Sequence, residues 1–201
     1  MGCIAEALIR GGAKILQYRN KGSDTGLFLR DAELLRAVTE AHGVPFIVND
    51  RVDAALAVCA DGVHVGRHDM PASDARALVG KDRWVGLSVG SCSELEFSGS
   101  ADYIGVGAIF PTGTKPHAEI HGLDLVRSVR ACTRLPLIGI GGITLDNVTS
   151  VIEAGCDGVA VISAVIGGDD IENTVKRFIE KIQETKATTP SLYRMPKAGR
   201  C

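Results

Sequence analysis

The chain of 201 residues is poor in aromatic residues, carries little net charge and lacks a long apolar run. Aromatic residues make up 4% of it, so a buried core must be built mostly from Val, Ile, Leu and Ala. The net charge of −2 provides no general basic field for nucleic acid or for an anionic membrane surface. The longest apolar stretch, residues 159–166, is interrupted by Ser163 and is too short to cross a bilayer. We therefore expect no nucleic-acid or membrane partner.

Cysteine is present, but not in a metal-binding pattern. The six cysteines lie at positions 3, 59, 92, 132, 156 and 201, form no Cys-x-x-Cys pair and have no histidine at ligand spacing. No charged and then apolar leader opens the sequence. We expect reduced thiols in a cytoplasmic protein, and neither a zinc site nor a disulfide framework.

Short β-branched segments alternate with segments of helical period along most of the chain. Seven segments are nearly continuous in apolar residues, as in parallel strands covered on both faces: 14–19, 45–49, 62–66, 84–88, 103–107, 136–140 and 158–162. Helical periodicity lies between or after several of them, at 27–41, 123–131, 146–154 and 170–184. Repeated strand–helix–strand units predict an α/β protein with a parallel sheet.

The ends of the later strands favour a TIM (β/α)8 barrel, with an open doubly wound sheet as the alternative. These strands run into clusters of Gly, Ser and Asp, where the side chains of a barrel site converge. A barrel needs an eighth strand, yet residues 4–10, which precede the first visible strand, have the pattern of a helix. We expect a barrel whose first β-strand is missing from this chain. One domain would cover residues 1–184, and residues 185–201 would form a loose tail.

Charged side chains follow the first three predicted strands. Gln17, Arg19 and Lys21 alternate, so on a strand they point the same way, either into the barrel or into solvent. Asp50 and Asp69 follow the next two strands. Taken singly, an aspartate after a strand is more often a helix N-cap. Together the two carboxylates predict a Mg²⁺ site beside a bound anion.

Small and hydroxyl-bearing residues follow the later strands and predict a second anion site made largely of main-chain groups. They are Thr112, Gly113 and Thr114 in one loop, Gly141 and Gly142 in the next, and Ser163 after the last strand. An ordinary turn explains the two adjacent glycines equally well.

Seven motifs occur in order along the chain. They are Gln-x-Arg-x-Lys at 17–21, Asn-Asp-Arg at 49–51, Asp-Gly-Val-His-x-Gly at 61–66, Asp-Met-Pro at 69–71, Pro-Thr-x-Thr-Lys at 111–115, Gly-Ile-Gly-Gly-Ile at 139–143 and Ile-Ser-Ala at 162–164. In these motifs residues 4–181 resemble the thiamine phosphate synthase family. The resemblance implies a transferase that joins hydroxymethylpyrimidine diphosphate to a thiazole phosphate, giving thiamine monophosphate and pyrophosphate, with Mg²⁺ as cofactor.

The resemblance also implies roles for single residues. Those expected to hold the pyrimidine diphosphate are Gln17, Tyr18, Arg19, Asn20, Lys21, Asn49, Ser88 and Lys115. Among them, Arg19, Lys21, Ser88 and Lys115 would serve catalysis. Asp50 and Asp69 would bind the metal. The thiazole phosphate would be held by Thr112, Gly113, Thr114, Gly141, Gly142, Ile162 and Ser163.

Two departures and two rival functions accompany the resemblance. The family's first strand is absent, and Arg67 stands where the family usually has glutamine. A related thiazole tautomerase has a histidine where this chain has Ala108, and it lacks the Pro-Thr-x-Thr-Lys loop. A catalytically inactive phosphate-binding barrel is the other alternative. The sequence leaves the oligomeric state open, a homo-oligomer included.

Overall fold

The computed structural model describes residues 1–113 and 119–188 and confirms an α/β fold with a parallel sheet. All seven predicted strands form, and their order in the sheet follows the chain. They are β1 (Leu16–Tyr18), β2 (Phe46–Asn49), β3 (Gly62–Val65), β4 (Trp84–Val89), β5 (Tyr103–Val106), β6 (Leu137–Ile140) and β7 (Gly158–Ala160). Each strand pairs in parallel with the next, for example Val48 with Val63 between β2 and β3.

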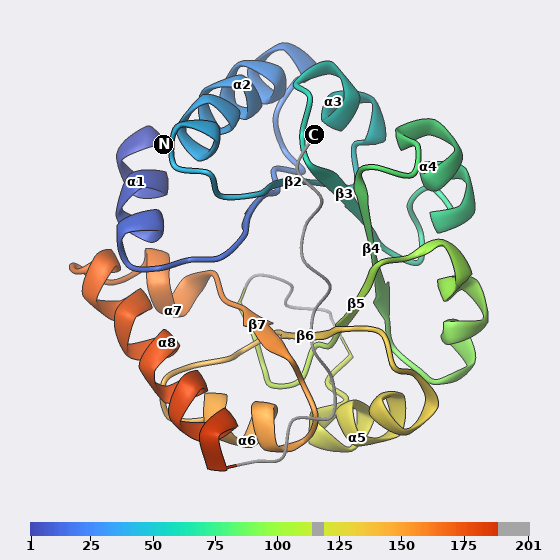
Figure 1. Cartoon of the computed structure of the whole chain (residues 1–201), viewed down its shortest axis with the longest axis vertical. Coiled ribbons are helices and arrows are strands. Elements are labelled where there is room, and N and C mark those ends of the chain that lie inside the picture. The colour runs from blue at the N-terminus through green and yellow to red at the C-terminus, as the bar shows by residue number, and fades with distance from the viewer. Residues whose placement is uncertain (114–118, 189–201) are drawn as a thin grey trace.

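Helices surround the strands (Figure 1). They are α1 (Gly2–Arg10), α2 (Thr25–Ala41), α3 (Val52–Ala57), α4 (Ala72–Val79), α5 (Gly122–Cys132), α6 (Val148–Glu153), α7 (Ser163–Ile166) and α8 (Ile171–Thr188), with a 3₁₀ segment, η1 (Ser93–Ser100). The strands are buried under this layer: every residue of β2, β3 and β5 is buried. Burial on both faces explains why these strands are apolar without a polar alternation.

Amphipathic patterns place the helices. In α2 the buried side chains Phe28, Ala32, Leu35 and Thr39 recur at helical spacing, and Asp24 caps the helix by accepting a hydrogen bond from the Leu27 amide at 2.8 Å. Helix α8 continues to Thr188, past the predicted end at residue 184, and in this last turn Thr185 is buried and its hydroxyl donates to the Lys181 carbonyl at 2.7 Å. Of the predicted tail, residues 189–201 lie outside the described residues.

Three aspartates form hydrogen bonds with the amino ends of the strands. Each directly precedes a strand, accepts a backbone amide from the first or second residue of the preceding strand and pairs with an arginine. The sets are Asp61 with the Phe46 amide (2.8 Å) and Arg36 (2.8 Å), Asp102 with the Val85 amide (2.7 Å) and Arg76, and Asp157 with the Leu137 amide (2.9 Å) and Arg130 (3.1 Å). We call these three sets the strand-end clusters. They lie at the end of the sheet opposite the loops that follow the strands.

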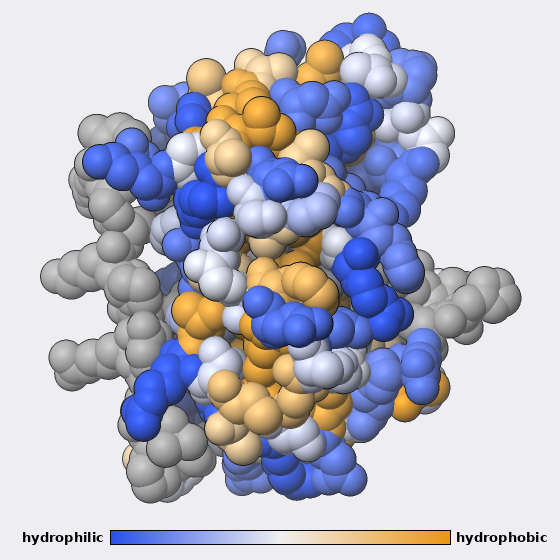
Figure 2. Space-filling view, turned by 90° about the vertical axis from the view of Figure 1, so that its right-hand side faces the viewer, coloured by the Kyte–Doolittle hydropathy of each residue, from blue (hydrophilic) through white to orange (hydrophobic). Residues whose placement is uncertain are grey.

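The sheet is open within the described residues, since no pairing joins β7 to β1. Helix α1 contacts both α2 and α8, and Figure 1 shows it between them on the outside of the sheet. No helix among residues 1–113 and 119–188 has the length and apolar character needed to cross a membrane. Figure 2 shows the side of α4 and η1, where apolar side chains interrupt the polar surface. Leu78 and Phe97, in these two elements, are exposed.

Candidate active site

A cavity of about 840 Å³ lies at the carboxyl ends of the strands. Every strand contributes to its lining, from Gln17 on β1 to Ala160 on β7, and the loops that follow the strands complete it. In a TIM-like fold this end of the sheet carries the active site, because neighbouring parallel strands bring their following loops together.

The wall formed by β1 to β3 is charged. Asp50 accepts hydrogen bonds at its Oδ2 from Arg19 Nη1 at 3.1 Å and from Lys21 Nζ at 3.0 Å. Asp50 itself has a positive φ of 65° directly after β2, a conformation that aspartate tolerates better than most residues. The side chains of Arg19 and Asp50 are about four-fifths buried, whereas Lys21 is largely exposed at the rim.

The two aspartates predicted to bind a metal lie side by side. Burial raises the pKa of Asp69, and its hydrogen bond with Asp50 raises it further. Burial also acts to raise the pKa of Asp50, but the hydrogen bonds with Asp69 and Lys21 and the charge of Arg19 outweigh it and lower that pKa. The two carboxylates therefore interact, and their pKa values move in opposite directions. The Gly66 amide donates to Asp69 Oδ2 at 3.0 Å and holds this side chain in place.

This donor set fits Mg²⁺. Two adjacent carboxylates offer hard oxygen ligands and an unfavourable repulsion that a divalent cation would relieve. Among residues 1–113 and 119–188 no cluster of three or more His, Cys, Asp or Glu side chains is placed to hold a metal. Such a cation would therefore complete its coordination with oxygen atoms from water or from a bound phosphate, as Mg²⁺ commonly does.

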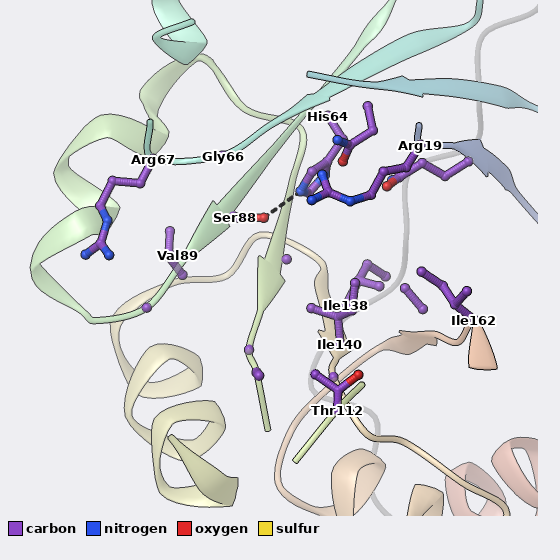
Figure 3. A pocket seen from close by; sticks show the side chains of 18 of the residues that line it. Arg19, His64, Gly66, Arg67, Ser88, Val89, Thr112, Ile138, Ile140 and Ile162 are labelled. Carbon is purple, nitrogen blue, oxygen red and sulfur yellow. Dashed lines mark hydrogen bonds between the residues drawn. The ribbon is translucent and has the colours of Figure 1, made fainter. Parts of the chain in front are cut away.

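A hydrogen-bonded row crosses the floor of the cavity. His64 Nδ1 lies 3.1 Å from the Tyr103 hydroxyl, and His64 Nε2 lies 2.8 Å from Ser88 Oγ (Figure 3). His64 and Tyr103 are buried, and burial raises the pKa of Tyr103 so that its hydroxyl keeps its proton. The row therefore fixes the position of the Ser88 hydroxyl at the cavity.

Two glycines make room for this row. His64, Gly86 and Tyr103 are register partners across β3, β4 and β5. A Cβ atom on Gly86 would lie 2.2 Å from Tyr103 Cζ and 2.4 Å from His64 Nδ1. A Cβ on Gly105 would lie 3.0 Å from His64 Cε1. Only glycine at these positions lets the two rings meet above the sheet.

Asn49 presents an amide to the cavity. It lines the cavity and is buried, yet its Nδ2 has no hydrogen-bond partner among the described residues. A buried donor without a partner costs free energy, so a ligand acceptor at this point would be stabilising.

The opposite wall is largely aliphatic and carries two hydroxyl residues. Figure 3 shows Thr112, Ile138, Ile140 and Ile162 across the cavity from Arg19 and His64. Gly141 and Ser163 also line this side. Gly141 has a φ of 98°, and a Cβ there would lie 2.7 Å from Ala108 Cβ, so both conformation and packing require glycine.

Comparison with known proteins assigns the chain to a family. The family model described as "Thiamine monophosphate synthase" matches residues 3–165. The chain belongs to this family. It is 44% identical over 180 residues to a thiamine-phosphate synthase of Alkaliphilus oremlandii, covering 89% of this chain and 86% of that protein. It is 45% identical over 186 residues to one of Chloroflexus aurantiacus, covering 91% and 86% respectively.

A solved structure agrees with these relatives. A thiamine phosphate pyrophosphorylase from Pyrococcus furiosus superimposes with a TM-score of 0.84 and 36% identity, covering 92% of this chain and 90% of that one. The family resemblance inferred from the seven motifs is thereby confirmed.

The cavity brings together most of the residues predicted from sequence. Those that line it are Gln17, Arg19, Lys21, Asn49, Asp50, Asp69, Ser88, Thr112, Gly141, Ile162 and Ser163. Gly113 and Gly142 are not in its lining: Gly113 is exposed, and the Gly142 backbone packs against Phe110 and Pro111. Thr114 and Lys115 lie outside the described residues. The substrate and metal roles of all these residues stay predictions.

The side chains of Tyr18 and Asn20 point away from the cavity, and their substrate roles stay predictions. Tyr18 is buried under α2, where it packs on Phe28 and donates to Asp31 Oδ2 at 2.9 Å. Asn20 accepts the Gly22 amide at 3.1 Å within its own loop. Residues 18 and 20 alternate with Gln17 and Arg19 along the extended chain, so their side chains point away from the cavity.

Arg67, the departure from the family pattern, turns away from the two aspartates. Figure 3 shows it directed away from Arg19 and His64. It pairs with Glu94 at 2.7 Å, and Glu94 also accepts the Gly90 amide at 2.9 Å. Arg67 therefore ties the loop after β3 to the segment after β4 at the rim of the cavity.

The sequence analysis missed the structural role of His64 and Tyr103. A histidine in a strand is more often a core residue, and the sequence gives no partner for it. A usable signal was present in Gly86, since a glycine inside a short buried strand indicates close approach by neighbouring groups.

Proposed function

We propose that this chain joins hydroxymethylpyrimidine diphosphate to a thiazole phosphate and releases pyrophosphate, giving thiamine monophosphate. The observation that carries the proposal is one cavity with two unlike walls: a charged wall with Arg19, Lys21, Asp50 and Asp69, and a largely apolar wall that carries the hydroxyls of Thr112 and Ser163. A substrate with a diphosphate and a partner with one phosphate suit this division. Holding both in one cavity would convert a bimolecular reaction into an effectively unimolecular one.

The charged wall supports departure of a diphosphate. Arg19 and Lys21 formally cancel the charges of Asp50 and Asp69, so the wall alone has no excess positive charge for an anion. Bound Mg²⁺ would supply that excess and stabilise charge on the leaving group. Arg19 and Lys21 would then be available to donate to phosphate oxygens. Lys115, from the Pro-Thr-x-Thr-Lys motif, is proposed to add a further cation.

The remaining polar groups would orient the pyrimidine. Asn49 has a free buried donor, Gln17 lines the same side, and Ser88 is held by His64. No protein nucleophile is needed, because loss of pyrophosphate leaves a pyrimidine-stabilised cation that the thiazole nitrogen captures. Thr112 and Ser163, with the backbone around Gly141, are proposed to hold the thiazole phosphate.

The test mixes both substrates with the purified protein and follows pyrophosphate release with and without Mg²⁺. We expect release only with both substrates and the metal. Asp50→Asn and Asp69→Asn should each lower turnover on the order of 10²-fold or more while the protein stays folded. The matched control is Asp53→Asn, since Asp53 is exposed and pairs only with Arg51. Turnover unchanged in either site variant would refute the metal assignment.

The same assay separates the rival functions. Isomerisation of the thiazole without pyrophosphate release would indicate a tautomerase. Binding of both substrates without turnover would indicate an inactive phosphate-binding barrel. Either result would overturn the proposal.

We also propose that the sheet is a (β/α)8 barrel that lacks one strand between β7 and β1. The position of α1 between α8 and α2 supports this, because α1 completes the outer ring of helices where no strand lies inside it. Hydrogen exchange tests it. Backbone amides of β1 should exchange faster than those of β3 and β4, and equal protection would mean that another segment fills the gap.

The proposed setting is the cytoplasm, with the two substrates as partners. Exposed apolar side chains on the side of α4 and η1, such as Leu78 and Phe97, favour a homo-oligomer. Light scattering on the purified protein would give its mass in solution, and a mass of about 21 kDa would refute the oligomer.

A further inference from the structure

Two cysteine thiols that the proposed reaction does not use lie in contact. Cys132 Sγ donates to Cys92 Sγ at 3.0 Å, although 40 residues separate the two in the chain. Cys92 directly precedes η1, and Cys132 is the last residue of α5. Cys92 is partly buried and Cys132 is exposed, so a small reagent has access to the pair.

We propose that Cys92 and Cys132 are an oxidisable pair that forms one intramolecular disulfide when the protein meets a low-molecular-weight disulfide such as oxidised glutathione. This inference does not depend on the proposed function. It goes beyond the expectation of simple reduced thiols, since it gives two of them a specific partner.

The exchange balances in two steps. The Cys132 thiolate attacks one sulfur of glutathione disulfide, forms a mixed disulfide and releases one glutathione thiolate. The Cys92 thiolate then attacks the Cys132 sulfur, forms the protein disulfide and releases the second glutathione. The two protein thiols lose their protons and two electrons, and one glutathione disulfide becomes two glutathione molecules. Contact between the two sulfurs makes the second step intramolecular.

The redox state of the pair follows the ratio of glutathione disulfide to glutathione. The pair therefore stays reduced under reducing conditions and closes when the disulfide concentration rises. The hydrogen bond with Cys132 is the main cause of a raised pKa at Cys92, so Cys132 rather than Cys92 is taken as the first attacking thiol.

The bond would join the rim of the cavity to the outer helix layer. Ser91 and Glu94, which flank Cys92, line the cavity, and Glu94 holds Arg67 and the Gly90 amide. A disulfide from Cys92 to the end of α5 would fix this rim segment against a second element. It would also close a loop of about 40 residues, which restricts the unfolded chain.

The experiment treats the reduced full chain with oxidised glutathione under native conditions and maps disulfides by mass spectrometry after digestion. We expect a linked peptide pair that contains Cys92 and Cys132, and a Tm higher by about 5 °C or more than that of the reduced protein. Cys92→Ser should instead carry one glutathione on Cys132, with no linked pair. Cys59→Ser, which changes an exposed cysteine elsewhere, should form the bond as the wild type does.

Three results would overturn the inference. One is separate glutathione adducts on Cys92 and Cys132 in the wild type. Another is a native bond of either cysteine to a different one. The third is a wild-type protein in which Cys92 and Cys132 both stay free thiols after this treatment.

Discussion

Asp157→Asn should destabilise the protein more than the same change at either of the other strand-end clusters. Asp157 and Arg130 are the most buried of the three pairs, with side chains 16% and 11% exposed. Asparagine keeps the shape and one oxygen for the Leu137 amide, but it removes the charge that faces Arg130. Losing the charge-assisted bond beside a nearly buried guanidinium should cost about 2 kcal/mol of unfolding free energy.

The other two strand-end clusters provide an internal comparison for the loss of unfolding free energy. The carboxylates of Asp61 and Asp102 are 40% and 42% exposed, so water can replace part of the lost interaction. Asp61→Asn and Asp102→Asn should therefore cost about 1 kcal/mol or less. Asp124→Asn is the control, because the Asp124 side chain is 93% exposed in its pair with Arg127 and should change stability little.

Urea unfolding of the four variants at neutral pH measures these differences directly. Turnover at saturating substrate should stay near the wild-type value, because the strand-end clusters lie at the opposite end of the sheet from the cavity. The reasoning fails if Asp61→Asn or Asp102→Asn costs as much as Asp157→Asn. It fails equally if the Asp157 variant is as stable as the Asp124 variant.

Three further predictions concern buried groups. Tyr103→Phe removes the hydroxyl that meets His64 and should lower kcat about 5-fold to 10-fold with a loss of only about 1 kcal/mol in stability, checked by steady-state kinetics and urea unfolding. Gly86→Ala should cost about 1–3 kcal/mol and lower kcat further, whereas Gly99→Ala, with nothing near its Cβ, should do neither. Burial raises the pKa of Cys156 from 9.0 to about 12. Because an unfolded thiol ionises first, the unfolding free energy of the wild type should fall more steeply between about pH 9 and 12 than that of Cys156→Ser, and parallel pH curves would refute this.

The strands and the charged wall could be predicted because both follow local rules. Buried parallel strands need continuous apolar runs, and the alternation of Gln17, Arg19 and Lys21 on one strand fixes a shared direction. The same alternation directs the Tyr18 side chain away from the cavity, as the structure shows.

The rest depends on contacts between distant segments. His64 contacts Tyr103 because of the register of β3, β4 and β5. Arg67 pairs with Glu94 because the segments that follow β3 and β4 fold toward each other. The pair Cys92 and Cys132 is likewise separated by 40 residues and has no local signature. Composition and spacing along the chain carry no information about such partners.

The order of the strands has a consequence for how this enzyme family can diversify. Since neighbours in the sheet are neighbours in the chain, Arg19, Lys21, Asp50 and Asp69 are encoded before about residue 70, and the isoleucines that line the cavity are encoded after residue 137. Under the proposed function, changes in the last third of the gene would alter the site of the thiazole phosphate while these four charged residues stay intact. Acceptor specificity would then change without loss of the two carboxylates proposed to hold the metal.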